Sequence, residues 1–139
     1  MRTSTDRILT THVGSLPRPK VVTNGLFSID AGGLIDHDEH ERAVSAAVRD
    51  VVSRQVDAGL DVVNDGEMSK ISYTTYIRDR LSGFEGDSPS QRPQDIEAYP
   101  RYAKRLASTP GVPRYRRPRC VGPIEVKDMR PLETDMRNL

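Results

Sequence analysis

The chain is predicted to fold as an α/β protein with a parallel sheet. Two short apolar runs with β-forming side chains, residues 8–13 and 60–64, each lead into a polar turn that contains glycine. A helical pattern follows each run, at 36–59 and at 69–82. Because parallel strands need a crossover connection, this order of strand, helix, strand and helix predicts a βαβα arrangement.

The first half of the pattern has clear boundaries. The first strand is expected to end near His12, and residues 14–35 hold six Gly and Pro residues, which favours a long loop with at most a short turn at 26–29. Residues 36–39 supply N-cap candidates and negative charge for a helix start. Gly59 is expected to stop that helix.

The second half begins with a strand, 60–64, that is apolar at nearly every position except Asp61, as in strands covered on both faces. The helix at 69–82 is expected to end before Gly83. Residues 83–118 then form a long loop rich in Pro and Arg, with room for a short helix around 99–108.

The last residues add a third strand, expected at 119–124, and a helix that starts at Pro131. Three strands make too small a parallel sheet to close on itself. We therefore expect residues 1–139 to be the front part of a larger fold.

Composition and charge exclude several classes of function. The 139 residues suit one domain, and 21 Lys and Arg against 20 Asp and Glu leave a net charge of +1. Neither nucleic acid nor a membrane surface is therefore expected as a partner. The chain has one cysteine, no run of about 18 apolar residues and no signal-peptide pattern, so a cytoplasmic protein is expected.

The exits of the two predicted strands carry the candidate binding residues. After the first strand, Val13, Gly14 and Ser15 offer backbone N–H groups and a hydroxyl that could hold a carboxylate or phosphate. After the second, Glu67 would need a cationic partner if buried, and the ammonium group of a ligand would serve. Together the two exits could hold both ends of a zwitterionic amino acid.

Both exits also have purely structural explanations. A Gly-Ser pair occurs in ordinary turns, Asp65 could simply cap its turn, and Glu67 could favour the dipole of the next helix.

Other reactive side chains give weaker signals. His12 could act as a base, an orienting donor or a metal ligand. His37 and His40 have a spacing that could bind a metal, although a solvated helix face is the simpler reading. Cys120 is expected to be a small buried hydrophobe. The arginine-rich run 114–119 is interpreted as a solvated loop with an optional anion contact.

Three segments resemble one known family when read in order. They are THVGSLPRP at 11–19, QVDAGLDVVNDGE at 55–67 and YIRDRLSGFEG at 76–86. They are similar to the start of the catalytic barrel of the cobalamin-independent methionine synthases, and CVGPI at 120–124 looks like that family's third strand. The resemblance implies that residues 1–139 form the first part of an eight-stranded (β/α) barrel of the TIM type, which typically needs about 250 residues.

The resemblance also implies a function. Members transfer a methyl group from a methylated folate to the thiol of homocysteine, with a zinc ion that binds the thiol. Carried over to this sequence, the residues that hold the amino-acid part are Val13, Gly14, Ser15 and Glu67. The family's zinc ligands lie on later strands and match no residue here, so neither a catalytic nor a metal-binding residue is assigned.

Two alternatives remain open at this point. His12 stands where the long two-barrel members carry Thr, so the chain looks closer to short single-barrel relatives, some of which alkylate other thiols such as coenzyme M. The second alternative is a non-catalytic binding or assembly module that pairs with the rest of the barrel on another chain. In either case we expect this chain by itself to be inactive.

Overall fold

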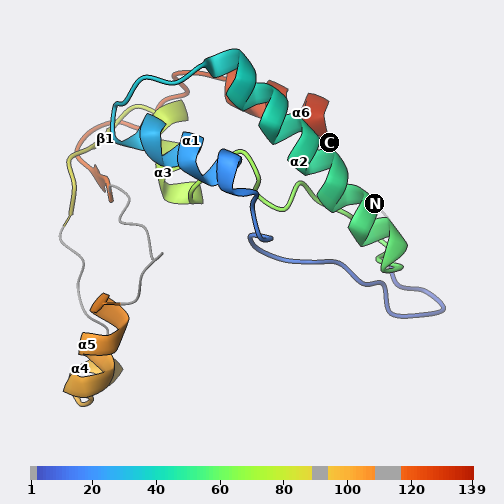
Figure 1. Ribbon diagram of the computed structural model, residues 1–139, viewed down its shortest axis with the longest axis horizontal. Coiled ribbons are helices and arrows are strands. Elements are labelled where there is room, and N and C mark those ends of the chain that lie inside the picture. The colour runs from blue at the N-terminus through green and yellow to red at the C-terminus, as the bar shows by residue number, and fades with distance from the viewer. Residues whose placement is uncertain (1–2, 89–93, 109–116) are drawn as a thin grey trace.

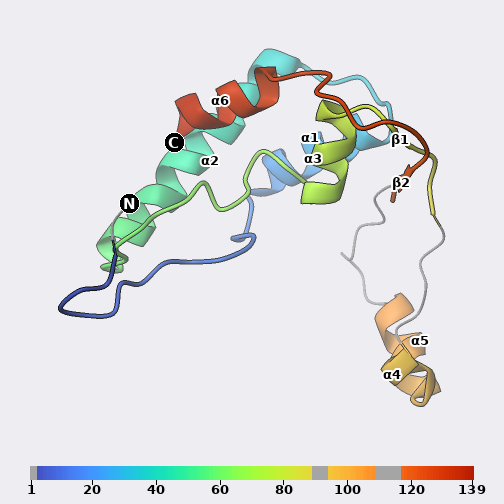
Figure 2. The same ribbon diagram turned by 180° about the vertical axis from the view of Figure 1, so that it is seen from behind.

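The computed structural model describes residues 3–88, 94–108 and 117–139. In chain order its elements are α1 (Lys20–Asp30), α2 (His37–Asp57), α3 (Tyr73–Arg80), β1 (Phe84–Glu85), α4 (Gln94–Glu97), α5 (Pro100–Ser108), β2 (Arg119–Cys120) and α6 (Arg130–Asn138). Helices α1, α2, α3 and α6 form one body, and α4 and α5 lie apart from it in both views (Figures 1 and 2). No helix of the described residues is long and apolar enough to span a bilayer.

Helix α2 is the longest element and confirms the predicted helix. The Asp36 carboxylate accepts a hydrogen bond from the Glu39 N–H at 2.9 Å and so caps the first turn. The helix ends at Asp57, and Gly59 follows with φ of 77°, the left-handed conformation expected of a residue just past a helix end.

Helix α1 corrects the expectation of a loop over residues 14–35. Val22 and Leu26, one helical turn apart, are buried against α2, and that burial outweighs the poor helix propensity of the segment. Gly25 lies at the contact, where a β-carbon would come 2.3 Å from Nδ1 of His40. Glycine there lets the two helices approach closely, so it supports the packing rather than breaking the helix.

One apolar cluster holds these helices together. Its buried members come from α1, α2 and the turn before α3, and they are Val22, Leu26, Val44, Ala47, Val48, Val51 and Met68. Leu16 packs against this cluster from the loop after the first predicted strand. The core therefore fixes the two loops that carry the candidate binding residues.

The two predicted parallel strands lie side by side, but the structure does not extend them. Thr11 and Val62 form an isolated parallel bridge, and the Thr10 carbonyl accepts from the Val62 N–H at 3.1 Å. Asp61 receives two hydrogen bonds from Thr10 and an ion pair from Arg7, which hold the pKa of its carboxyl well below its usual range. The predicted direction of pairing is confirmed. The expected length is wrong, because a strand pair without further neighbours gains little from extension.

The third predicted strand is also corrected. Residues 119–124 supply only β2, which pairs antiparallel with β1, with Phe84 opposite Cys120. Cys120 is exposed on this two-stranded ribbon, so the expectation of a buried thiol is wrong.

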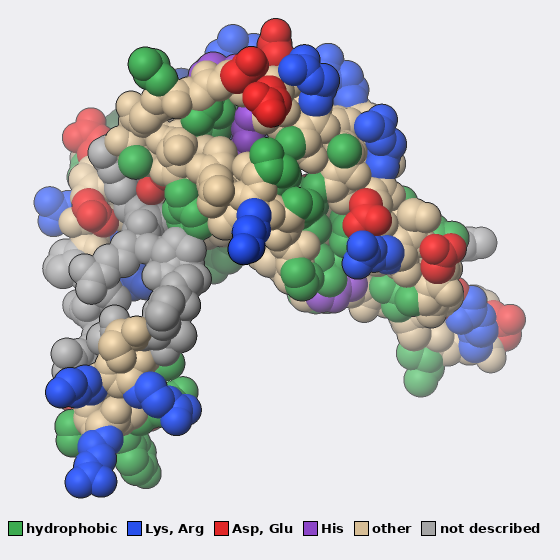
Figure 3. Space-filling model, in the orientation of Figure 1, with side chains coloured by type: hydrophobic (Ala, Val, Ile, Leu, Met, Phe, Trp, Pro, Cys, Tyr) green, Lys and Arg blue, Asp and Glu red, His purple; other side chains and the backbone are tan. Residues whose placement is uncertain are grey.

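Three of the expected helices are present with shifted bounds. Helix α3 is shorter than the predicted 69–82, because Ser72 caps its start by accepting from the Thr75 N–H at 3.3 Å. Helix α5 confirms the helix expected around 99–108, and α6 confirms the one expected from Pro131. Charged side chains of both signs are mixed over the main body in Figure 3, in keeping with the net charge of +1.

Candidate functional site

The two predicted strand exits meet. The Ser15 hydroxyl donates a hydrogen bond to Oε2 of Glu67, and the Leu16 N–H donates to the Gly66 carbonyl at 3.0 Å. These contacts join residues about fifty positions apart, and both follow from the parallel pairing of Thr11 with Val62. The structure therefore brings together Ser15 and Glu67, the two side chains expected to bind opposite ends of an amino acid.

Glu67 lies in a tight turn with an uncommon backbone conformation. Its φ is 56° and that of Gly66 is 60°. The Gly66 N–H donates to Oδ1 of Asn64 at 2.8 Å, and the Glu67 N–H donates to Oδ1 of Asp65 at 2.9 Å. Asp65 thus caps the turn, as its structural explanation proposed. Glu67 instead precedes α3 by several residues, so it does not serve the N-terminus of that helix.

Val13 and Gly14 belong to the same loop as Ser15, but in the described part of the chain neither is directed at Glu67 by a hydrogen bond. The Val13 side chain is 85% exposed, and Gly14 has φ of 92°. The Gly14 carbonyl lies 2.9 Å from Nε2 of His12, which turns that carbonyl back toward the end of the strand. In this arrangement Val13 and Gly14 contribute backbone groups beside Ser15, and among the described residues no hydrogen bond joins either of them to Glu67.

Arg18 joins the two exits and was not singled out from the sequence. Its Nε and Nη2 donate to the Glu67 carbonyl at 3.0 and 2.9 Å, and Nη2 also donates to the Lys70 carbonyl at 2.6 Å. The same Nη2 lies 3.3 Å from the Ser15 hydroxyl oxygen. Burial lowers the pKa of Arg18, while the charges of Glu67 and Asp65 oppose that shift. The available signal was its position, three residues after Ser15 and between two prolines.

Asn64 and Gln55 hold the base of the site. The Asn64 amide donates to the His12 carbonyl at 2.7 Å. Gln55 of α2 is buried, and its side chain donates to the Asn64 carbonyl at 2.7 Å and accepts from the Asn64 N–H at 3.1 Å. These bonds satisfy backbone groups that a regular sheet would pair, so α2 fixes the position of the second exit.

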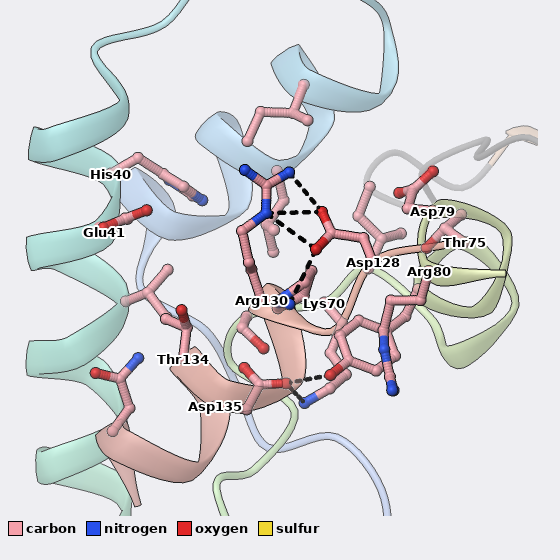
Figure 4. A pocket seen from close by; sticks show the side chains of 18 of the residues that line it. His40, Glu41, Lys70, Thr75, Asp79, Arg80, Asp128, Arg130, Thr134 and Asp135 are labelled. Carbon is pink, nitrogen blue, oxygen red and sulfur yellow. Dashed lines mark hydrogen bonds and ion pairs between the residues drawn. The ribbon is translucent and has the colours of Figure 1, made fainter. Parts of the chain in front are cut away.

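Lys70 extends the site toward α6 (Figure 4). Its Nζ lies 2.6 Å from Oδ2 of Asp65 and 3.1 Å from Oδ2 of Asp135, which also accepts from the Tyr76 hydroxyl at 2.8 Å. Burial acts to lower the pKa of Lys70, but the bond to Asp65 and the two acidic charges raise it on balance. The same pair lowers the pKa of Asp65 despite its burial.

Two cavities border this region. One of about 500 Å³ is lined by His12, Leu16 and Arg18 together with residues of α2. The other, of about 680 Å³, lies between α1, α2, α3 and α6, and Lys70 and Asp135 are among its lining residues (Figure 4). The second cavity has mixed charge, because two of the arginines that line it, Arg78 and Arg130, are paired with Asp30 and Asp128.

The described residues do not form a metal site. No group of three or more His, Cys, Asp or Glu side chains in residues 3–88, 94–108 and 117–139 is placed to hold a metal ion. His37 and His40 lie on α2, and burial next to α1, together with the charge of His37, lowers the pKa of His40. The described donor set therefore does not fit the zinc ion that the family resemblance implies.

The arginine-rich run 114–119 is only partly described. Residues 114–116 lie outside the described residues, so the anion contact expected there stays a prediction. Of the remainder, the Arg117 N–H donates to Oδ1 of Asp87 at 2.9 Å, and Arg119 belongs to β2.

Polar groups that meet where neighbouring parallel strands end occupy the position at which α/β proteins bind small ligands. Comparison with known families agrees with this arrangement. The family described as "Cobalamin-independent synthase, Catalytic domain" matches residues 8–105, well over half of the chain and both strand exits. The chain belongs to this family.

Individual relatives are named methionine synthase. The chain is 37% identical over 76 residues to a methionine synthase of Sulfolobus acidocaldarius, a match that spans 55% of this chain and 22% of the relative. It is 38% identical over 80 residues to a methionine synthase of Sulfurisphaera tokodaii, covering 58% of this chain and 23% of that protein. The chain thus spans less than a quarter of the length of these two relatives.

A solved structure shows the shared fold. A B12-independent methionine synthase from Shewanella sp. W3-18-1, in complex with selenomethionine, superposes with a TM-score of 0.54 at 20% sequence identity. The match covers 94% of this chain and 34% of the other. The fold of this chain is therefore that of one part of a B12-independent methionine synthase.

Proposed function

We propose that this chain forms the amino-acid-binding part of a methyltransferase that moves a methyl group from a methylated folate to the thiol of homocysteine. Family membership and the relatives named methionine synthase support the reaction. The observation that carries the proposal is the contact between Ser15 and Glu67 at neighbouring strand exits. In the complete protein these exits would be the first two of an eight-stranded barrel.

The chemistry of the site suits a zwitterion. The Glu67 carboxylate can accept hydrogen bonds from an α-ammonium group, and charge-assisted bonds of this kind are the stronger ones. The Ser15 hydroxyl, with the backbone N–H groups of Val13 and Gly14 beside it, can donate to an α-carboxylate. An incoming amino acid would replace the bond between Ser15 and Glu67 with one bond to each of its own ends.

The solved relative binds an amino acid of the kind proposed here. Its structure is described as a complex with selenomethionine, an amino acid that corresponds to the methylated product with selenium in place of sulfur. A site for that product would also hold the amino-acid part of homocysteine, since the two ligands share it.

We assign to the described residues the binding of the amino-acid part of the substrate, not the activation of its thiol. Lowering the pKa of a thiol for methyl transfer needs a metal or a cationic neighbour. The described donors do not gather into a metal site, and the cations beside Glu67 are already bonded, Arg18 to backbone carbonyls and Lys70 to two carboxylates. Activity is therefore proposed for the complete protein, whereas recognition of the amino acid is proposed for this chain.

Glu67 also discriminates between the two candidate thiols that could accept the methyl group, homocysteine and coenzyme M. Coenzyme M carries a sulfonate and no ammonium group, so a carboxylate at the site would repel it without gaining a bond. Homocysteine carries an α-ammonium group, which can bond to the Glu67 carboxylate. The Glu67 side chain therefore favours an amino-acid thiol over coenzyme M as the acceptor.

Calorimetric titration of the chain with L-methionine, L-homocysteine and coenzyme M tests the proposal. Glu67→Gln and Ser15→Ala should each weaken amino-acid binding about tenfold or more, because each removes a bond to a charged group. Asp50→Asn, on the exposed face of α2, serves as the control and should bind as the wild type does. Equal affinity of Glu67→Gln and wild type would remove Glu67 from the site, and preferential binding of coenzyme M would overturn the choice of acceptor.

A further inference from the structure

We infer that Arg18 is a positioning residue of this site, whose guanidinium group holds Glu67 in the backbone conformation that aims its carboxylate at Ser15. The inference rests on the proposed function for its consequence in ligand binding. Its structural part concerns the two strand exits alone and can be tested without any ligand.

Glu67 needs such support. A residue with a side chain is disfavoured at positive φ by about 1–2 kcal/mol, and such conformations persist only when the surroundings fix them. Glu67, at φ of 56°, is the one residue other than glycine with positive φ in the described part of the chain. Its own turn contributes two bonds, one from its N–H to Asp65 and a longer one, at 3.3 Å, from the Lys70 N–H to its carbonyl.

Arg18 supplies a further constraint, with two shorter bonds to the same carbonyl. With Glu67 in the left-handed conformation, its carbonyl receives hydrogen bonds from both Nε and Nη2 of Arg18. The third bond, from Nη2 to the Lys70 carbonyl, reaches the far side of the same turn. One planar group therefore fixes the carbonyls of Glu67 and Lys70 relative to each other, which a single ammonium group on a flexible stem would do poorly.

The backbone on either side gives Arg18 a fixed direction. Pro17 and Pro19 flank it, so rotation is restricted before and after it, and Pro19 is also the N-cap of α1. Leu16 packs against the apolar core, and its N–H bonds to the Gly66 carbonyl. Arg18 thus reaches the Glu67 turn from a segment that is anchored at both ends.

Amide hydrogen exchange of the 139-residue chain tests the structural part. Arg18→Met and Arg18→Lys should each speed exchange of the Leu16 amide about tenfold or more, because the loop and the turn separate more often. Amides of α2, such as that of Val48, should keep their protection and so show that the variants fold. Arg54→Met is the control, because Arg54 lines the cavity beside Arg18 but forms its ion pair with Asp50 on the surface of α2.

L-methionine titration of the same variants tests the consequence for binding. Both Arg18 variants should lose about tenfold or more in affinity, and Lys should fail to rescue because charge without the planar geometry is insufficient. Full rescue by Lys in both measurements overturns the inference, as does a Leu16 amide that is unprotected in the wild type. If the Arg18 variants exchange faster but the wild type does not bind methionine, the proposed function is contradicted. The positioning role of Arg18 is then still supported.

Discussion

Lys70 and Asp135 join the turn that carries Glu67 to the last helix of the chain. Nζ of Lys70 lies 3.1 Å from Oδ2 of Asp135 on α6, and both side chains are largely buried. The same ammonium group lies 2.6 Å from Asp65, whose carboxylate caps the Glu67 turn. The turn is thus held both by Arg18, through its backbone carbonyls, and by Lys70, through Asp65.

Replacing Lys70 with Met should destabilise the chain by about 1–3 kcal/mol, because Asp65 and Asp135 would stay partly buried without their cation. Urea denaturation followed by circular dichroism measures the change. Arg54→Met, which removes a well-exposed ion pair, should change stability by about 0.5 kcal/mol or less. A Lys70 variant as stable as that control would show that the buried pairs contribute nothing.

The same network should make stability fall in acid. The folded-state pKa of Asp65 lies below its ordinary value of 3.8, so its contribution is present above that value and is lost as the pH falls toward the folded pKa. Denaturation midpoints measured from pH 6 downward should therefore decrease below about pH 4. Asp65→Asn should flatten this part of the profile, and an unchanged slope in that variant would contradict the assignment.

The shifted pKa of Lys70 predicts a loss of stability at alkaline pH as well. Its folded-state pKa lies above the ordinary value of 10.5, so its contribution is complete below that value and is lost as the pH rises through the folded pKa. Wild type should lose stability in this alkaline range more steeply than Lys70→Met. Parallel alkaline profiles for the two proteins would exclude this contribution.

Gly25 should tolerate alanine only when His40 is shortened. In Gly25→Ala the new β-carbon would meet the His40 ring at 2.3 Å, and overpacking of this kind costs about 1–3 kcal/mol. In a His40→Ala background the clash disappears and alanine favours the helix by about 1 kcal/mol over glycine. Thermal denaturation of the four proteins should show this reversal of sign, whereas additive effects would place the contact elsewhere.

Glu67→Gly should be more stable than Glu67→Ala by about 1 kcal/mol, because glycine adopts positive φ without strain and both variants lack the carboxylate. Neither should bind L-methionine as the wild type does. Chemical denaturation gives the difference directly, and an alanine variant at least as stable as the glycine variant would show that the backbone at this position is not strained.

Local signals predicted most of the helices. The Asp36 cap, the apolar spacing of α2 and Gly59 are close in sequence, so they mark one helix without reference to the rest of the chain. Helix α1 was missed, since its stability comes from Val22 and Leu26 packing on α2 and from a glycine that permits close contact. Propensity disfavours that helix, and tertiary burial decides it.

The candidate site was likewise predicted in part from the sequence, and the rest was revealed only by the structure. Residue chemistry at the two strand exits was sufficient to propose Ser15 and Glu67 as a pair, and parallel pairing of Thr11 with Val62 brings them into contact. Arg18 could not be assigned, because its partners are backbone carbonyls that only the folded chain brings near. Lys70 has one partner close in sequence, Asp65, but its second partner is a carboxylate of α6 that only folding brings near.

The sequence by itself determined the family, the order of most elements and the kinds of side chain at the two strand exits, since these depend on residue types at short spacings. The tertiary structure decided whether each side chain is buried or exposed, as shown by the exposed thiol of Cys120. It decided how far each strand extends as well. It also decided that Arg18 holds Glu67 in place. Contacts between residues about fifty positions apart depend on the packing of α1 and α2 around one apolar core, and no local pattern encodes that packing.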